Sequence, residues 1–269
     1  MGFRFLVRLS LAHVFFGIRA TPIFSRVGPW RSVTFYVGTN ISSPSEEGHR
    51  WPSQFGQDRF IAKIIFQEAM GFYVDLAANE PLKRSNTWAL EHFYGWKGIC
   101  IEANPDYMWP LLRHRSCKLV YAVAGQTDGE QIDFLFDNEG GLGGIVGDEF
   151  DNKPTKLREG RRLTLQTTTL ESILRKARAP RIVDYLSLGI EGAEEFVMSK
   201  FNFQSYIFRV LTIERPTAAL CSVLKSQGYA FVKMFGSRGD MLYVHRSMQK
   251  YVKIDPSSVE GSEWSYVLG

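Results

Sequence analysis

The sequence predicts an α/β fold in which helices cover both faces of a mostly parallel β-sheet. After about residue 53, short apolar runs alternate with stretches of helical spacing, the order expected of βα units. The last two apolar runs flank the glycine-containing turn 236–240, which predicts an antiparallel hairpin at one side of the sheet. Aromatic residues make up 14% of the 269 residues, more than a disordered chain would carry.

The individual elements follow from local patterns along the chain. The first helix rests on Phe60, Ile61, Ile64 and Ile65, whose spacing places them on one helical face. Each strand is a short apolar run bounded by polar or glycine-containing segments. Strands are expected at 72–77, 98–101, 119–124, 132–136, 163–167, 182–188, 207–213, 230–234 and 241–245, with 132–136 less central than the others. Helices are expected at 57–66, 87–94, 107–113, 170–176, 193–200 and 218–227.

One stretch, residues 137–162, shows neither the helical spacing of apolar residues nor a short apolar run typical of a strand. Five glycines lie within residues 140–147 and are followed by Pro154 and a run of mixed charges. Long segments of this kind inside a domain are usually functional or disordered. We therefore expect a long mobile loop here, either a lid over a ligand or simple disorder.

The positive charge of the chain is concentrated in its first residues. The formal net charge is +4, and Arg4, Arg8, Arg19, Arg26 and Arg31 lie in an N-terminal segment, residues 1–45, without acids or lysines. Removing these five from the 32 basic residues leaves 27 against 28 acidic residues, a net charge of −1 for the rest. A basic patch typical of a nucleic-acid-binding domain is therefore not expected in the body of the protein.

The basic segment is typical of a targeting signal. The uncharged run 9–18 is shorter than the roughly 20 apolar residues of a membrane span. It suits a signal peptide or short membrane anchor in the secretory pathway, with Ala20 as a candidate cleavage position. A mitochondrial or plastid transit peptide, or an untargeted disordered tail, are the alternatives, and membrane contact is expected only through this leader. The sequon at Asn40 matters only in the secretory route.

Three cysteines, Cys100, Cys117 and Cys221, are too few and too scattered for a disulfide framework or a metal cluster, so no metal site is expected. They are most simply buried apolar side chains. Cys100 and Cys117 fall near neighbouring predicted strands, which leaves one disulfide open in an oxidising compartment.

Acidic residues follow the first two strands, where an open α/β sheet places its ligand site. Asp75 stands in Asp-Leu-Ala-Ala-Asn, without the glycine fingerprint of dinucleotide enzymes, so a nicotinamide oxidoreductase is the least favoured alternative. An acid there suits a cationic ligand such as an amine or sulfonium, or caps the following turn. Glu102 can accept both hydroxyls of a ribose, or cap a helix. Together the two acids suit S-adenosylmethionine, whose sulfur is positively charged.

The chain resembles the FkbM-type family of S-adenosylmethionine-dependent methyltransferases between about Ser53 and His245. The segments that carry the resemblance are 53–58 (SQFGQD), 72–79 (FYVDLAAN), 85–87 (SNT), 96–102 (WKGICIE), 104–105 (NP), 184–188 (DYLSL), 191–194 (EGAE) and 212–216 (TIERP). The resemblance implies a class I methyltransferase fold, Rossmann-like, with seven strands of which the last is antiparallel. With the basic leader and a linker rich in Gly, Ser, Pro and Glu at 38–52, the expected organisation is a leader and linker at 1–52, a methyltransferase domain at 53–248 and a tail at 249–269.

The family resemblance further implies which residues contact the cofactor. Asp75 and its turn would lie beside the methionine part, Glu102 would hold the ribose, and Val123 and Ala124 would flank the adenine. The segment Gln54–Asp58 would close over the cofactor. The full set of expected cofactor-binding residues is Gln54, Gln57, Asp75, Ala77, Asn79, Asn86, Glu102, Asn104, Val123 and Ala124.

Two positions depart from the family pattern. Ala77 stands where many members have glycine, and Gly189 stands where the pattern has an aspartate at the end of a strand. The lost carboxylate is a candidate general base, substrate contact or metal ligand, and Glu191 or Glu214 would have to replace it. The candidate bases are therefore Glu191, Glu214 and His245, although Glu214 can simply pair with an arginine and His245 can be a surface or capping residue.

These features predict an enzyme that methylates the hydroxyl of a small molecule or sugar. The alternative is a methyltransferase-fold binding protein that has lost catalysis through Gly189.

Overall fold

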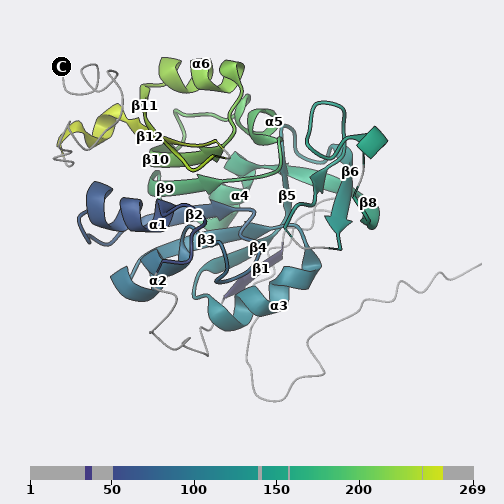
Figure 1. Ribbon diagram of the computed structural model, residues 1–269, viewed down its shortest axis with the longest axis horizontal. Coiled ribbons are helices and arrows are strands. Elements are labelled where there is room, and N and C mark those ends of the chain that lie inside the picture. Colours follow the sequence, from purple (N-terminus) through teal and green to yellow (C-terminus); the bar gives the residue numbers. More distant parts are fainter. Residues whose placement is uncertain (1–33, 38–50, 139–140, 157, 238, 251–269) are drawn as a thin grey trace, which may run out of the picture.

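The computed structural model describes residues 34–37, 51–138, 141–156, 158–237 and 239–250. Its centre is an eight-stranded sheet with the order β1-β4-β3-β2-β9-β10-β12-β11 (Figure 1). The strands of this sheet are β1 (Thr34–Val37), β2 (Phe72–Leu76), β3 (Lys97–Glu102), β4 (Lys118–Tyr121), β9 (Ile182–Leu188), β10 (Ile207–Glu214), β11 (Tyr229–Phe235) and β12 (Asp240–His245).

The predicted parallel sheet with a closing hairpin is confirmed. Strands β4, β3, β2, β9 and β10 run parallel to one another. Strand β12 runs antiparallel to both β10 and β11 and lies between them. Without β1, these are the seven strands, with an antiparallel C-terminal pair, that a class I methyltransferase fold requires. The carboxyl ends of β2, β3 and β9 consequently meet at one edge.

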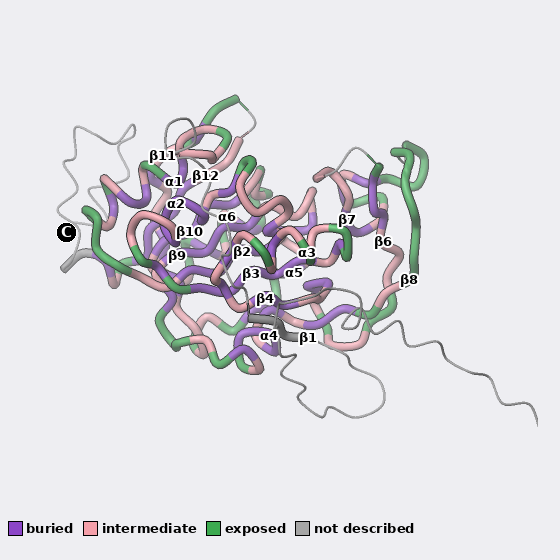
Figure 2. The backbone as a smooth tube through the Cα atoms, turned by 90° about the horizontal axis from the view of Figure 1, so that it is seen from below, coloured by how far each residue is buried: buried purple, intermediate pink, exposed green. Residues whose placement is uncertain are grey.

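Both faces of the sheet are covered, as the sequence predicts. On β2, Val74 and Leu76 pack with helices α4 (Leu170–Ala177), α5 (Glu194–Met198) and α6 (Ala218–Ser226). Tyr73 points to the opposite face, in a core with residues of α1 (Gln57–Phe60), α2 (Trp88–Tyr94) and α3 (Pro105–His114). Figure 2 shows the resulting layer of buried strands in the middle of the molecule. Burial on both faces explains why these strands are nearly continuous apolar runs.

Strand β1 lies in the segment that the sequence assigns to the leader and linker. It pairs antiparallel with β4 and extends the sheet by one strand. The expected signal-peptide run 9–18, the sequon at Asn40 and the tail after residue 250 lie outside the described residues. Among the described residues, no helix is both long and apolar enough to cross a membrane.

The stretch 137–162, expected as a long loop, is largely irregular in the described residues, but it is anchored at both ends in regular structure that was not expected there. A second, four-stranded sheet with the order β5-β8-β6-β7 projects from the main sheet and includes the two ends of this stretch and residues 144–145. Its strands are β5 (Val123–Gly125), β6 (Gln131–Asp137), β7 (Gly144–Ile145) and β8 (Gly160–Thr169). We call residues 131–169 the arm. The first half of β8 is exposed, so its side chains carry charges without the apolar alternation that identifies a half-buried strand.

Two smaller expectations are also corrected. The strand expected at 119–124 is divided at Ala122, because β4 stays in the main sheet while β5 turns into the arm and pairs with β8. The helix expected at 57–66 begins as α1 but continues as a π-helix over Ile61–Ile65. A wider turn there keeps Ile61, Ala62 and Ile65 buried.

Cys100 and Cys117 form a disulfide rather than staying as separate apolar side chains. Cys100 lies on β3 and Cys117 directly precedes β4, with 6.0 Å between their Cα atoms. Both are buried. Cys221 is the free cysteine of the described chain.

Candidate cofactor and acceptor site

Two adjoining cavities lie at the carboxyl ends of the parallel strands. We call the inner one the slot, which is lined by residues of β2, β3, β5 and the arm. We call the other the outer cavity, with a volume of about 790 Å³. The two share Leu76, Ala77, Asn79, Gly141, Gly189 and Glu191. The shared lining makes the two cavities one continuous site, in which a ligand can extend from the slot into the outer cavity.

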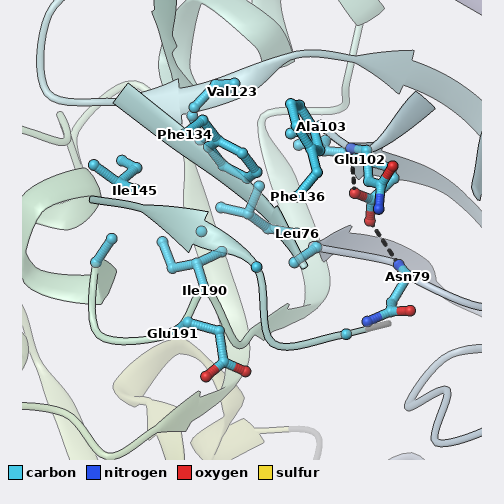
Figure 3. A pocket seen from close by; sticks show the side chains of 18 of the residues that line it. Leu76, Asn79, Glu102, Ala103, Val123, Phe134, Phe136, Ile145, Ile190 and Glu191 are labelled. Atoms are coloured by element: carbon cyan, nitrogen blue, oxygen red, sulfur yellow. Dashed lines mark hydrogen bonds between the residues drawn. The ribbon is translucent and has the colours of Figure 1, made fainter. Parts of the chain in front are cut away.

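The walls of the slot are apolar. Figure 3 shows Val123, Phe134, Phe136, Ile145 and Ile190 gathered between Glu102 on one side and Glu191 on the other. Flat apolar walls of this kind fit an aromatic ring system such as a nucleobase. The sequence predicts Val123 and Ala124 as residues of this site but does not predict Phe134, Phe136, Ile145 and Ile190. In the sequence, the alternation of Ile132, Phe134 and Phe136 indicates a strand with one apolar face. It does not indicate that this face lines the cofactor site.

Glu102 is held rigidly at the end of β3. Its Oε2 accepts the backbone N–H of Asn79 and its Oε1 accepts that of Asn104, each at 2.7 Å (Figure 3). Each carboxylate oxygen keeps a further lone pair for a ligand hydroxyl. Burial raises the pKa of Glu102 to about 7, although these backbone hydrogen bonds favour the charged form. The side chain of Asn104 instead caps α3 by accepting the N–H of Asp106 at 3.0 Å.

The turn after β2 has the backbone conformation that favours glycine. Ala77 and Asn79 have φ values of 67° and 52°, in the left-handed region. For a residue with a side chain, this conformation costs roughly 1–2 kcal/mol. The backbone N–H groups of Ala77 and Ala78 both bond the carbonyl of Ile101, which fixes the turn against β3. The structure thus explains the family preference for glycine and shows that alanine is accommodated.

Asp75 lies at the floor of the outer cavity, inside a buried polar network. Its Oδ2 accepts the hydroxyl of Thr87 at 2.5 Å, and Arg115 donates to the same hydroxyl at 2.7 Å. Arg115, which is fully buried, also donates to Glu91 at 3.1 Å and to Tyr73 at 2.9 Å. Burial raises the pKa of Asp75, and the positive charge of Arg115 offsets this only in part. The network fixes the Asp75 carboxylate at the edge of the sheet.

Glu191 stands at the junction of the two cavities. Among the described residues it is the one ionisable side chain that lines both. Its backbone is left-handed, with a φ of 54°, a strained geometry that is frequent at functional sites. Burial, together with the negative charges of Glu214 and Asp151, raises the pKa of Glu191 to about 7. A carboxylate with such a pKa suits a general base at neutral pH.

Glu214 borders the position where the family aspartate is missing. A Cβ added at Gly189 would meet Oε2 of Glu214 at 3.5 Å, an ordinary contact distance. Glu214 pairs with Arg215 at 3.1 Å, and the same guanidinium also pairs with Asp151 and lies 3.9 Å from Glu191. Burial raises the pKa of Glu214. The space near Gly189 is therefore still bordered by carboxylates.

Three further predicted cofactor-binding residues lie at the outer cavity. Gln54, Gln57 and Asn86 line the outer cavity together with Asp75. Asn86 donates from Nδ2 to Ser187 at 3.1 Å, while its Oδ1 is buried without a hydrogen-bond partner in the described structure.

His245 is not brought together with the other candidate bases. It lies on β12, where its Nδ1 is 2.8 Å from the hydroxyl of Ser247 and its ring packs on Tyr229. It lines neither cavity. Burial lowers its pKa. These contacts fit a structural histidine.

Comparison with known proteins gives one match. The family described as "Methyltransferase FkbM domain" matches residues 75–231, more than half of the chain. No curated protein and no solved structure matches.

Proposed function

Because the chain belongs to the FkbM methyltransferase family, we propose that it methylates a hydroxyl group of a polar small molecule or sugar. Membership in this family implies the use of S-adenosylmethionine. The position of Glu191, at the junction of an apolar slot and a polar cavity, is the observation that carries the proposal. A base at this junction can reach a hydroxyl presented from the outer cavity.

The residues of the slot and of the adjoining part of the outer cavity fit the cofactor. Val123 and Phe134 would enclose the adenine, and Glu102 would accept the ribose hydroxyls. Asp75 and the unpaired Oδ1 of Asn86 would receive the methionine ammonium. An unpaired buried amide oxygen is costly unless a ligand satisfies it, which supports this placement.

The chain's own contribution to the reaction is orientation and proton transfer. When bound, S-adenosylmethionine supplies a methyl group on a positively charged sulfur. The outer cavity orients the acceptor oxygen. Glu191 accepts the proton of the acceptor hydroxyl as the oxygen gains the methyl group, so Glu191 ends the step as a neutral carboxylic acid.

The lining of the outer cavity favours a hydroxyl-rich acceptor. Gln54, Gln57, Ser237 and Asp240 present polar groups, whereas Phe55 and Leu142 are among its few large apolar side chains. Gln57 and Asp240 bond each other, but a flat apolar acceptor would cover the exposed amide of Gln54 and hydroxyl of Ser237 without satisfying them, which is unfavourable. Sugars and other polyols satisfy them.

Calorimetry with S-adenosylmethionine, followed by transfer of labelled methyl to a panel of sugars and polyols, tests the proposal. We expect Glu102→Ala to weaken cofactor binding about 10- to 100-fold, because a charged hydrogen-bond acceptor is lost. The matched control is Glu130→Ala, since Glu130 is exposed and lines neither cavity. Equal affinity of wild type and Glu102→Ala would overturn the ribose assignment. Absence of cofactor binding by wild type would overturn the function.

We also propose that the enzyme works in the lumen of the secretory pathway. The basic leader and the Cys100–Cys117 disulfide support this, because buried disulfides persist mainly in oxidising compartments. A fluorescent protein fused behind residues 1–45 should enter the secretory pathway. A diffuse cytosolic signal would contradict both targeting hypotheses, and a mitochondrial or plastid signal would favour the transit peptide.

A further inference from the structure

We propose that the acceptor carries an anionic group, such as a phosphate ester or a carboxylate, which binds Lys83, Arg84 and Arg158 at the mouth of the outer cavity. This inference rests on the proposed function, since it describes the acceptor of that site. The sequence patterns do not single out any of the three residues.

The three cations come from two separate segments and line one cavity. Lys83 and Arg84 lie between β2 and α2, and Arg158 lies in the arm just before β8. All three are exposed, and no ion pair or side-chain hydrogen bond is found for them within the described residues. Their charges are therefore available to a ligand.

Most acids of the same cavity are already engaged. Arg215 pairs with Asp151, Glu214 and, at 3.9 Å, Glu191. Asp240 accepts a hydrogen bond from the side-chain amide of Gln57. The hydroxyl of Thr87 bonds Asp75, which also lies near the buried Arg115. Although acids outnumber bases in the lining, the charges without partners are mainly positive, and such a mouth attracts anions.

The cofactor does not account for all of this charge. S-adenosylmethionine has one carboxylate, whereas three cations stand at the mouth. Arg158 also belongs to the arm and lies close enough to Glu191 to favour its charged form. An anion bound there lies beside the proposed base, which is where the acceptor must be placed.

The backbone at Arg84 provides independent support. Its φ of 62° lies in the left-handed region, which is unfavourable for a residue with a side chain. Strained residues of this kind cluster at ligand-binding positions. The strain holds an arginine at the mouth of the cavity, next to Lys83.

The experiment uses the full chain loaded with S-adenosylhomocysteine, so that the partners of the cofactor carboxylate are occupied. Sodium phosphate is titrated against sodium chloride at matched ionic strength and pH 8, and the amide resonances of residues 83–85 and 158–160 are followed. We expect these resonances to shift saturably with sodium phosphate and not with sodium chloride. Sodium acetate in a parallel titration separates a phosphate-type site from a carboxylate-type site.

Variants then assign the shifts to the three cations. Arg84→Gln and Arg158→Gln should each weaken phosphate binding about 3- to 10-fold, as expected for partly exposed charged contacts, with S-adenosylhomocysteine affinity unchanged. Lys156→Gln is the matched control, because Lys156 is exposed on the same arm and does not line the cavity.

Three results would overturn the inference. These are equal effects of phosphate and chloride, phosphate binding that the variants leave unchanged, and a loss of S-adenosylhomocysteine affinity in both variants. The last result would assign the cations to the cofactor carboxylate. Failure of wild type to bind S-adenosylhomocysteine would count against the proposed function instead, and phosphate titration of the ligand-free protein would still test the cations.

Discussion

Replacement of Glu191 by glutamine is expected to lower the turnover number about 10²- to 10⁴-fold, the usual contribution of a general base. Glutamine keeps the shape of the side chain but cannot accept the acceptor proton. Since Glu191 lines the cofactor slot with few polar neighbours there, the dissociation constant of S-adenosylmethionine should change little. Calorimetry and single-turnover rates measure the two quantities separately.

The pH profile gives a second readout for the same variant. A general base works when it is deprotonated, and the pKa of Glu191 is raised to about 7. The wild-type rate should therefore rise with pH up to about 7 and then level off. In Glu191→Gln this dependence should disappear, leaving a low rate that is nearly independent of pH.

Glu194 provides a matched control for the pH profile. Burial also raises its pKa to about 7, but its carboxylate accepts the N–H of Ile190 at 2.8 Å and lines neither cavity. Glu194→Gln should keep the turnover number and its dependence on pH. If Glu191→Gln keeps both and Glu214→Gln loses them, Glu214 is the base, and it acts from beside Gly189.

The sequence predicts the centre of this site because parallel strands bring their carboxyl ends together. Asp75 and Glu102 each follow an apolar run, and adjacent parallel strands necessarily place them at the same edge. The order of the elements and the closing hairpin follow from the same alternation. Local patterns and burial on both faces are sufficient for this part of the molecule.

The arm could be predicted only in part. The strands expected at 132–136 and 163–167 lie within β6 and β8, but the first half of β8 is exposed, so no apolar period marks its start, and β7 has two residues. The contacts of Phe134 and Phe136 with the slot depend on how the arm folds back over β3, which no local pattern specifies. The same limit applies to His245, whose strand is correctly predicted but whose position is outside the cavities.

Removal of the buried charge of Arg115 is expected to have the largest effect on stability. Arg115→Met should lower the free energy of unfolding by about 3–5 kcal/mol, the usual cost of leaving one partner of a buried ion pair alone. Glu91 would remain buried beside the hydroxyl of Tyr73 without its cation. Urea unfolding followed by circular dichroism measures the change. Arg113→Met is the control, because Arg113 lies two residues away, is exposed and stacks on Trp109.

The pH dependence and a double variant identify the ion pair as the cause. Burial raises the pKa of Glu91, but the charge of Arg115 and hydrogen bonds bring it below the usual value. In wild type, the stabilisation from Glu91 is thus present above its usual pKa and is lost as the pH falls through the lowered value. Without Arg115 the pKa of Glu91 rises, so the difference in stability between Arg115→Met and wild type should shrink at acidic pH.

Arg115→Met combined with Glu91→Gln should lose less stability than the sum of the single changes. Additive losses would show that Arg115 stabilises the protein through its hydrogen bonds to Thr87 and Tyr73 rather than through the ion pair. Since Thr87 also holds Asp75, that outcome would predict a matching loss of cofactor affinity in Arg115→Met alone.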